Sequence, residues 1–419
     1  MKRLRIKALL VGFSSLAVIG QAGAGGFNRG VANLDGLYGA AQLGFYGGVT
    51  YVSPQRSYET IEGTNVGFFP STNPPGQSGP VYITDFTQTD VTFSNDYVVP
   101  YASVGGRIVG DVNCVGSYVQ PFGADSEYYG PITFQTASQK LETNEYGLTC
   151  GYGFDLSKGR LSLIGGTFYE TVDYSQARNF TGYIPGVSGD STVALDSGAW
   201  GYRLGVGYEI PEYALKAQLL YRSQTNHDAS GEYSNTPFYY LAALNGAGNL
   251  NPYNPSQLSA PASATASLPA MLDLTVQSGI AEGWLAFGSV KWTDWSVLSS
   301  IIVTEGLANQ PFSTTRFFFE DGWTVTGGVG HRFNESLAGS FSITWDKGVT
   351  TGWDTLTDTW TFAGGVAYDV KENIQVRAGG AAIYFTEGQK WQTASPIDYV
   401  ASSPAEWGYA LSISAAAKF

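Results

Sequence analysis

Charged side chains are scarce in this sequence of 419 residues, and histidine, cysteine and methionine are nearly absent. Lysine, arginine, aspartate and glutamate together make up 14% of the residues, whereas a soluble globular chain carries about 25%. Two histidines leave little material for a metal site or a histidine-dependent active site, so we expect no metal, no cofactor and no enzymatic activity. The 35 acidic residues outnumber the 22 basic ones, which argues against a nucleic-acid partner because phosphate binding needs clustered lysine and arginine.

Long apolar runs are also missing. No stretch after the N-terminus reaches about 18 consecutive apolar residues, so the sequence predicts no membrane-spanning helix. Residues 1–24 have the pattern of a secretory signal peptide, in which basic residues precede a short apolar run and small residues, Ala22 and Ala24, flank a cleavage site. The alternative is an N-terminal membrane helix, but the apolar run is too short to span a bilayer. We therefore expect export and removal of residues 1–24.

Glycine and aromatic residues are abundant, and apolar residues alternate with small or polar ones. In residues 198–210, Trp200, Tyr202 and Leu204 share one face, while several glycines and Arg203 share the other. This period of two is typical of strands. The apolar faces end in aromatic residues, as girdles at a bilayer interface do. The pattern predicts an all-β fold, a transmembrane antiparallel β-barrel rather than a soluble sandwich.

Six short turns alternate with seven long polar connections along the chain. This punctuation predicts fourteen strands with short periplasmic turns and long extracellular loops, and it places both chain ends on the periplasmic side of the outer membrane of a Gram-negative cell. The barrel is expected to occupy residues 41–419. Its predicted strands are 41–54, 97–109, 111–120, 141–156, 160–175, 194–210, 214–224, 267–280, 284–301, 315–333, 337–346, 358–370, 374–387 and 406–419.

Residues 25–40 precede the first predicted strand and show no strong helix or strand pattern. Two alternatives stay open for this segment, a disordered tail and a short plug folded into the lumen. At the other end of the chain, the aromatic residue Phe419 closes the last strand. Such an end resembles the signal read by the barrel assembly machinery, so we expect this machinery, outer-membrane lipid and lipopolysaccharide as partners.

Parity along the strands assigns both cationic and aromatic side chains to the lumen. The candidate ligand-binding residues are Arg203, Lys291, Arg222, Arg316, Phe168, Trp295 and Phe318. One interpretation is structural, in which buried charges of opposite sign pair and brace the wall. The other is that arginine or lysine anchors an anionic head while the apolar side chains cover the rest of an amphiphile.

Cys114 and Cys150 are the two cysteines of the chain. They fall on neighbouring predicted strands, at matching height and on the outward face, which predicts a cross-strand disulfide in an oxidising compartment. Two free buried thiols are the alternative. The spacing of the pair offers no redox motif.

Four short stretches in the second half of the chain carry a family resemblance. They are Leu268-Pro269, Lys291-Trp292-Thr293-Asp294-Trp295-Ser296, Phe318-Phe319-Glu320-Asp321-Gly322-Trp323 and Gly327-Gly328. In this order and spacing the sequence resembles the FadL/TodX family of outer-membrane transporters of hydrophobic compounds. The resemblance implies a monomer that takes up long-chain fatty acids or related hydrophobic molecules. It also implies capture by the extracellular loops, a pocket in the lumen, and lateral exit at a kink in the third strand.

In this sequence the third strand is predicted at 111–120, and Gly116 is the natural position for the kink and lateral gate because glycine lets a strand bend. The family's N-terminal plug carries an Asn-Pro-Ala motif that this chain lacks. The most similar stretch in this chain is Asn33-Leu34-Asp35, which has no proline. The resemblance therefore does not extend to the plug motif.

Passive outer-membrane transport of long-chain fatty acids or related hydrophobic compounds is the leading hypothesis, driven by about 0.8 kcal/mol for each methylene that leaves water. A general diffusion porin is one alternative, and it predicts an open aqueous lumen with steady ion conductance. A surface-binding or adhesion barrel is another, and it would place the function in the long loops at 55–96 and 225–266.

Overall fold

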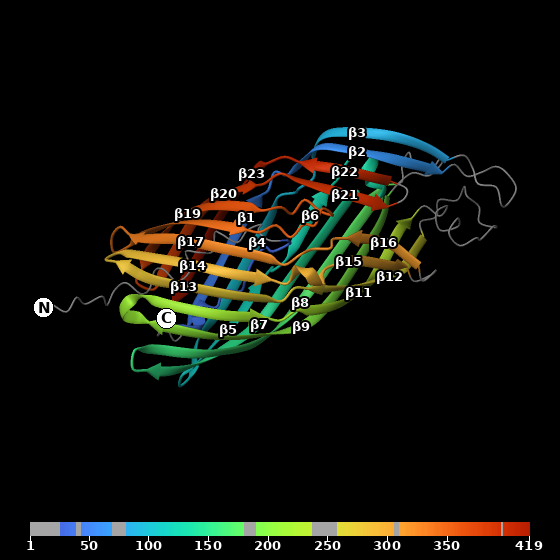
Figure 1. The fold of residues 1–419 in the computed structure, drawn as a ribbon. Coiled ribbons are helices and arrows are strands. Elements are labelled where there is room, and N and C mark those ends of the chain that lie inside the picture. Colours follow the sequence, from blue (N-terminus) through green and yellow to red (C-terminus); the bar gives the residue numbers. More distant parts are fainter. Residues whose placement is uncertain are drawn as a thin grey trace.

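Fourteen antiparallel strands close into a barrel in the computed structural model of this chain, which describes residues 26–38, 43–68, 81–179, 190–236, 258–305, 310–394 and 397–419 (Figure 1). Closure is made by β1 (Gly44–Ser53), which pairs with β4 (Tyr97–Val109) on one side and with β23 (Glu406–Lys418) on the other. The predicted fourteen-stranded antiparallel barrel is confirmed, and each predicted strand has one observed counterpart. Between β4 and β23 the wall consists of β5 (Val112–Val119), β7 (Ser138–Leu156), β8 (Gly159–Asn179), β9 (Asp190–Ile210), β10 (Leu215–Arg222), β13 (Met271–Ala281), β14 (Trp284–Thr293), β17 (Gly322–Arg332), β18 (Leu337–Asp346), β19 (Thr359–Lys371) and β20 (Ile374–Phe385).

Side chains alternate between the lumen and the outer face along these strands. On β14, Lys291 is 5% exposed and faces the lumen, while the adjacent Val290 is 40% exposed on the outer face. Aromatic side chains such as Trp200 and Trp407 are exposed on the outer face. No helix in the described part of the chain is long and apolar enough to cross a membrane. An apolar outer face with aromatic bands and a polar interior suits a barrel surrounded by lipid.

The two ends of the barrel differ. At one end short turns join neighbouring strands, as η4 (Pro211–Tyr213) does between β9 and β10, and the C-terminus lies at this short-turn end (Figure 1). At the other end, the described parts of the long connections contain nine further strands. The sequence predicted these connections only as polar loops, because their small and polar residues hide the strand pattern. The added strands are β2 (Ser57–Phe68), β3 (Val81–Thr92), β6 (Gly123–Glu127), β11 (Thr225–Thr236), β12 (Leu258–Leu268), β15 (Ser300–Glu305), β16 (Gln310–Arg316), β21 (Gly388–Ala394) and β22 (Ile397–Ser403).

The added strands build two structures at the long-connection end. The hairpin of β11 and β12 pairs with the long strand β9 on one side and with β15 on the other, so the barrel wall is extended there at the long-connection end. Strands β21, β22, β2 and β3 form a separate four-stranded sheet, which Figure 1 shows at the same end. Apolar side chains fill the space inside the first structure and beneath the second. The long connections are therefore mainly paired and packed structure.

Two predicted strands, 284–301 and 315–333, are shorter in the structure. Strand β14 ends at Thr293 and is followed by η5 (Trp295–Val297), while β17 begins only at Gly322. Between β16 and β17, Phe318 has a φ of 47°, a left-handed conformation that is rare for a bulky residue. Because these breaks interrupt the alternation of side chains, parity cannot place the residues within them.

Candidate ligand site in the barrel lumen

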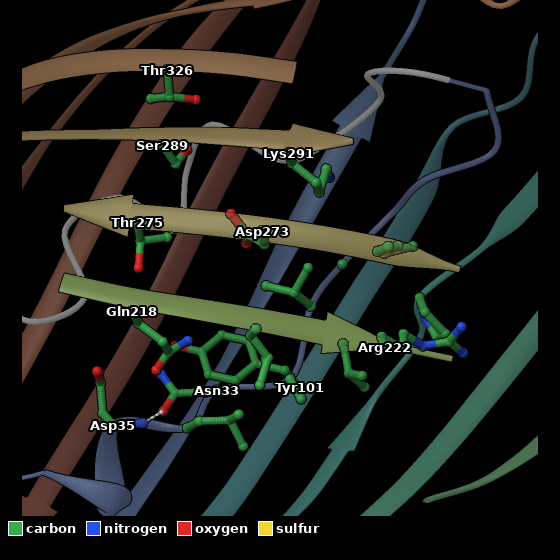
Figure 2. A pocket seen from close by; sticks show the side chains of 18 of the residues that line it. Asn33, Asp35, Tyr101, Gln218, Arg222, Asp273, Thr275, Ser289, Lys291 and Thr326 are labelled. Carbon is green, nitrogen blue, oxygen red and sulfur yellow. Dashed lines mark hydrogen bonds between the residues drawn. The ribbon is translucent and has the colours of Figure 1, made fainter. Parts of the chain in front are cut away.

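A cavity of about 250 Å³ lies inside the barrel, between the N-terminal segment and several wall strands (Figure 2). The N-terminal segment, residues 26–38, contributes the consecutive residues from Arg29 to Asp35 to its lining. Most of the remaining lining comes from β10, β13, β14 and β17, and from β4 and β5, which lie about half-way round the barrel in strand order.

The two sides of the cavity differ in polarity. Strands β4 and β5 contribute Val99 and Val119, and the N-terminal segment adds Leu34 to this apolar side. The side formed by β10, β13, β14 and β17 carries the apolar side chains of Leu220, Met271 and Phe287, and also a row of polar side chains on neighbouring strands, which Figure 2 shows. The polar side chains are those of Gln218, Thr275, Ser289 and Thr326. A site of this kind fits a ligand that is apolar on one face and forms hydrogen bonds on the other.

Arg203 and Arg222 line one end of the cavity but are held by buried carboxylates. Glu145 forms an ion pair with each of them, and its Oε2 lies 2.9 Å from Arg222 Nε. Arg222 Nη2 also lies 2.6 Å from Glu170 Oε1. Both guanidinium groups lie over the ring of Phe168, which is fully buried, with distances of 4.7 and 4.4 Å to the ring centroid. These contacts fit the bracing interpretation for the two arginines, since each buried charge has a charged partner.

Lys291 makes no direct ion pair in the described part of the chain, although its charge interacts with the buried carboxyl groups of Asp273 and Asp346. It lines the cavity from β14, and its ammonium forms no ion pair or hydrogen bond with any other residue that the structure describes. Asp273 lies opposite it on β13, and the Oδ1 atom of Asp273 likewise has no hydrogen-bond partner among the described residues. A second cation in the lining, Arg29, lies over the ring of Tyr97 at 4.0 Å. A buried ammonium with open donors is the position at which an anionic ligand gains most.

The remaining predicted site residues do not line this cavity. Trp295 lies in η5, fully buried, with its ring 5.7 Å from that of Phe27. The prediction that Phe318 faces the lumen is wrong, because its side chain is 44% exposed and its ring lies 5.3 Å from that of Trp353. Arg316, at the end of β16, also lies over Trp353, at 5.8 Å. Phe317 and Phe319, on either side of Phe318, are buried, so the alternation here is out of phase with that of β17, in which Gly322 and Thr324 are buried.

The third strand is interrupted beyond Gly116, the predicted position of the kink. Gly116 pairs with Val104 of β4 and with Leu148 of β7, so the ladder is continuous through it. Pairing with β7 stops at Val119 and resumes at Gly123, where β6 begins. The intervening residues 120–122 include a proline, which cannot donate to a ladder. Beyond Val119, the third strand also has no ladder with β4 among the described residues.

The N-terminal segment occupies the interruption. The backbone N–H of Arg29 donates to the carbonyl of Pro121 at 2.8 Å. Farther along the segment, Asp35 forms an ion pair with Lys216 of β10 at 3.2 Å. Leu37 is buried in an apolar cluster with side chains of β5 and β8. Residues 26–38 therefore lie against the lumen wall at several points along their length.

Cys114 and Cys150 face one another across β5 and β7. Their sulfur atoms are bonded at 2.08 Å. The bond joins the third and fourth barrel strands on the short-turn side of Gly116.

Residues 143–383 match the family described as outer membrane protein transport protein (OMPP1/FadL/TodX), and this match covers more than half of the chain. The chain belongs to the OMPP1/FadL/TodX family. Its fold is similar to that of a FadL homologue from Pseudomonas aeruginosa, with a TM-score of 0.68, 14% identity and 90% of each chain covered. The toluene transporter TodX of Pseudomonas putida has a TM-score of 0.56 and 13% identity, with 97% of this chain and 98% of that chain covered. The toluene transporter TbuX of Ralstonia pickettii has a TM-score of 0.54 and 14% identity, with 98% and 99% covered. The sequence matches no curated protein.

Membership of the FadL/TodX family confirms the predicted family and the outer-membrane location. The short-turn end of the barrel is then periplasmic and the long-connection end extracellular. Sequence reasoning left open whether the N-terminal segment folds into the lumen, and it named none of its residues as part of the site. The local sequence that indicates ordered structure in this segment is Asn33-Leu34-Asp35. The Asn33 side chain accepts a hydrogen bond from the Asp35 N–H at 3.1 Å, which is the geometry of an Asx turn.

Proposed function

We propose that the protein carries long-chain fatty acids or related anionic amphiphiles passively across the outer membrane by way of the lumen cavity. Lys291 carries this proposal, because it is a buried cation in the lining whose ammonium makes no direct hydrogen bond or ion pair in the described part of the chain, so that its donors are open to a ligand. Met271 and Phe287, which also line the cavity, supply apolar surface for a hydrocarbon chain. Burial of each methylene favours binding by about 0.8 kcal/mol, so no other energy source is needed.

We place the lateral exit at the interruption of the third strand, residues 120–122. There the backbone of Pro121 pairs with the N-terminal segment, whereas the corresponding end of β4 pairs only with β1. Movement of the N-terminal segment would open the wall without breaking a ladder between barrel strands. An apolar hollow of about 980 Å³ lies farther along the same strand, lined by Gly116, Val104 and Leu148 among others. Cargo that leaves sideways below the lipopolysaccharide avoids contact with periplasmic water.

Binding of an acid and of its alcohol tests the role of Lys291. In the K291M variant, we expect oleate to bind about tenfold to a hundredfold more weakly, since a hydrogen bond to a charged group contributes about 1.5–3 kcal/mol. Oleyl alcohol should bind almost as well as it does to the original protein. Displacement of a fluorescent fatty acid from the purified barrel measures both affinities.

The matched control is K347M, which removes a lysine from the extracellular surface, where Lys347 pairs with Glu320 at 3.0 Å. This variant should leave both affinities unchanged. Equal losses for oleate and oleyl alcohol in K291M would show that the lysine does not anchor the head group.

A further inference from the structure

We infer that the cavity selects amphiphiles that carry a hydroxyl or similar neutral polar group on the chain as well as an acidic head. This inference rests on the proposed function and names its cargo more closely. The polar side of the cavity is one rung of the sheet, running across four neighbouring strands. Register aligns Gln218 with Thr275, Thr275 with Ser289, and Ser289 with Thr326. All four residues line the cavity (Figure 2).

The two outer members of this rung already have partners, whereas the two inner ones do not. Gln218 accepts a hydrogen bond from the Tyr38 hydroxyl at 2.6 Å, and the Thr326 hydroxyl lies 2.9 Å from that of Thr344. No side-chain hydrogen bond of Thr275 or Ser289 occurs in the described part of the protein. Both side chains are half-buried, so their hydroxyls are available to a molecule in the cavity.

These open hydroxyls make an unbranched hydrocarbon a poor match for this side. A hydrocarbon laid against Thr275 and Ser289 would remove water from both without replacing its hydrogen bonds, at a cost of about 1–3 kcal/mol for each group left unpaired. A hydroxyl on the cargo would restore one of those bonds. Sites with such open polar groups reject the analogue that lacks the hydroxyl much more strongly than an apolar pocket rejects a missing methylene.

The geometry of β14 indicates where the neutral polar group would lie on the chain of the cargo, relative to the acidic head. Ser289 and Lys291 are two residues apart on β14 and face the same side, so their Cα atoms are about 7 Å apart. An acid held by Lys291 would thus bring the part of its chain next to the head group past Ser289 and Thr275. Its other face would meet the apolar side formed by Leu34 and Val99.

The test compares stearate with its 3-, 7- and 12-hydroxy derivatives, each displacing a fluorescent fatty acid from the purified barrel. At least one hydroxy acid should bind about tenfold more tightly than stearate. Simple burial of apolar surface predicts the opposite order, because a hydroxyl makes the free acid more soluble in water. In the T275V/S289A double variant, the ratio of the affinity for the hydroxy acid to that for stearate should fall towards one. In S289A alone, the ratio should fall less.

The control is T361V, because Thr361 continues the same rung onto β19, through Thr344, but does not line the cavity. It should keep the preference. Equal affinity of the original protein for all four acids would overturn the inference and leave the proposed function standing. No saturable binding of any of them would contradict the proposed function itself. Migration of each variant as a folded, heat-modifiable barrel in gel electrophoresis shows that it has folded.

Discussion

Glu145 shows how single residues set the charge pattern of the lumen. Its carboxylate is almost fully buried and pairs with both Arg203 and Arg222. Replacement by glutamine would leave the two guanidinium groups with one carboxylate, Glu170, between them. Breaking a buried ion pair from one side costs about 3–5 kcal/mol. We therefore expect E145Q to lower the free energy of unfolding by several kcal/mol, measured by urea titration of the barrel in lipid vesicles.

The matched variant is E320Q, which breaks the exposed ion pair with Lys347. Exposed pairs contribute at most about 1 kcal/mol, so this change should be small. A loss of stability in E145Q no larger than that in E320Q would contradict the bracing role of the arginine cluster.

Parity predicted which residues of regular strands face the lumen, and it failed where strands end. Lys291, Arg203 and Arg222 were predicted to face inward from the alternation of β9, β10 and β14, and they do. Among the described residues, the two arginines are paired with carboxylates and the lysine is not, because Glu145 and Glu170 lie beside the arginines. These glutamates come from other strands, so the local sequence around each cation does not predict whether it is paired. Phe318 was misplaced because it lies between β16 and β17, where the alternation shifts phase between Phe319 and Gly322.

The N-terminal segment and the third strand act together at the scale of elements. The segment is paired at the interruption through Arg29 and to β10 through Asp35, and no strand of the barrel ladder depends on it for closure. Deletion of residues 26–34 should therefore leave a folded barrel with a more open lumen. We expect steady single-channel conductance to rise several-fold in planar bilayers.

A single substitution tests whether the attachment of the N-terminal segment to the wall matters in addition to its presence in the lumen. The D35N variant removes the charge that pairs with Lys216 but keeps the chain in place, so its conductance should rise less than that of the deletion. Unchanged conductance after the deletion would show that the segment does not occlude the lumen.

The fourteen wall strands could be predicted because each buries one face and exposes the other to lipid, which enforces alternation over eight or more residues. The strands of the long connections could not. Strand β12, for example, is rich in alanine and serine, and its buried face consists largely of alanines such as Ala260, Ala262 and Ala264, so the difference in hydrophobicity between its two faces is small. The interruption of the third strand at residues 120–122 was not predicted, because only glycine was considered as a position where the strand bends and the effect of Pro121 was not weighed.

At the scale of the whole molecule, the closed wall separates two environments. The outer face is apolar with exposed aromatic residues, while the lumen holds a cavity with an open lysine and a row of hydroxyls opposite an apolar side. The N-terminal segment and the apolar cluster at the extracellular end occupy much of the remaining interior. This interior suits the binding of an amphiphile better than the free diffusion of water and ions.

Uptake of labelled oleate by cells with and without this gene, measured beside single-channel conductance of the purified barrel, tests the central claim most directly. We predict uptake that depends on the gene, saturates with concentration and falls in K291M, together with negligible steady conductance. Large steady conductance with no gene-dependent uptake of oleate would contradict the account and identify a general porin built on the same fold.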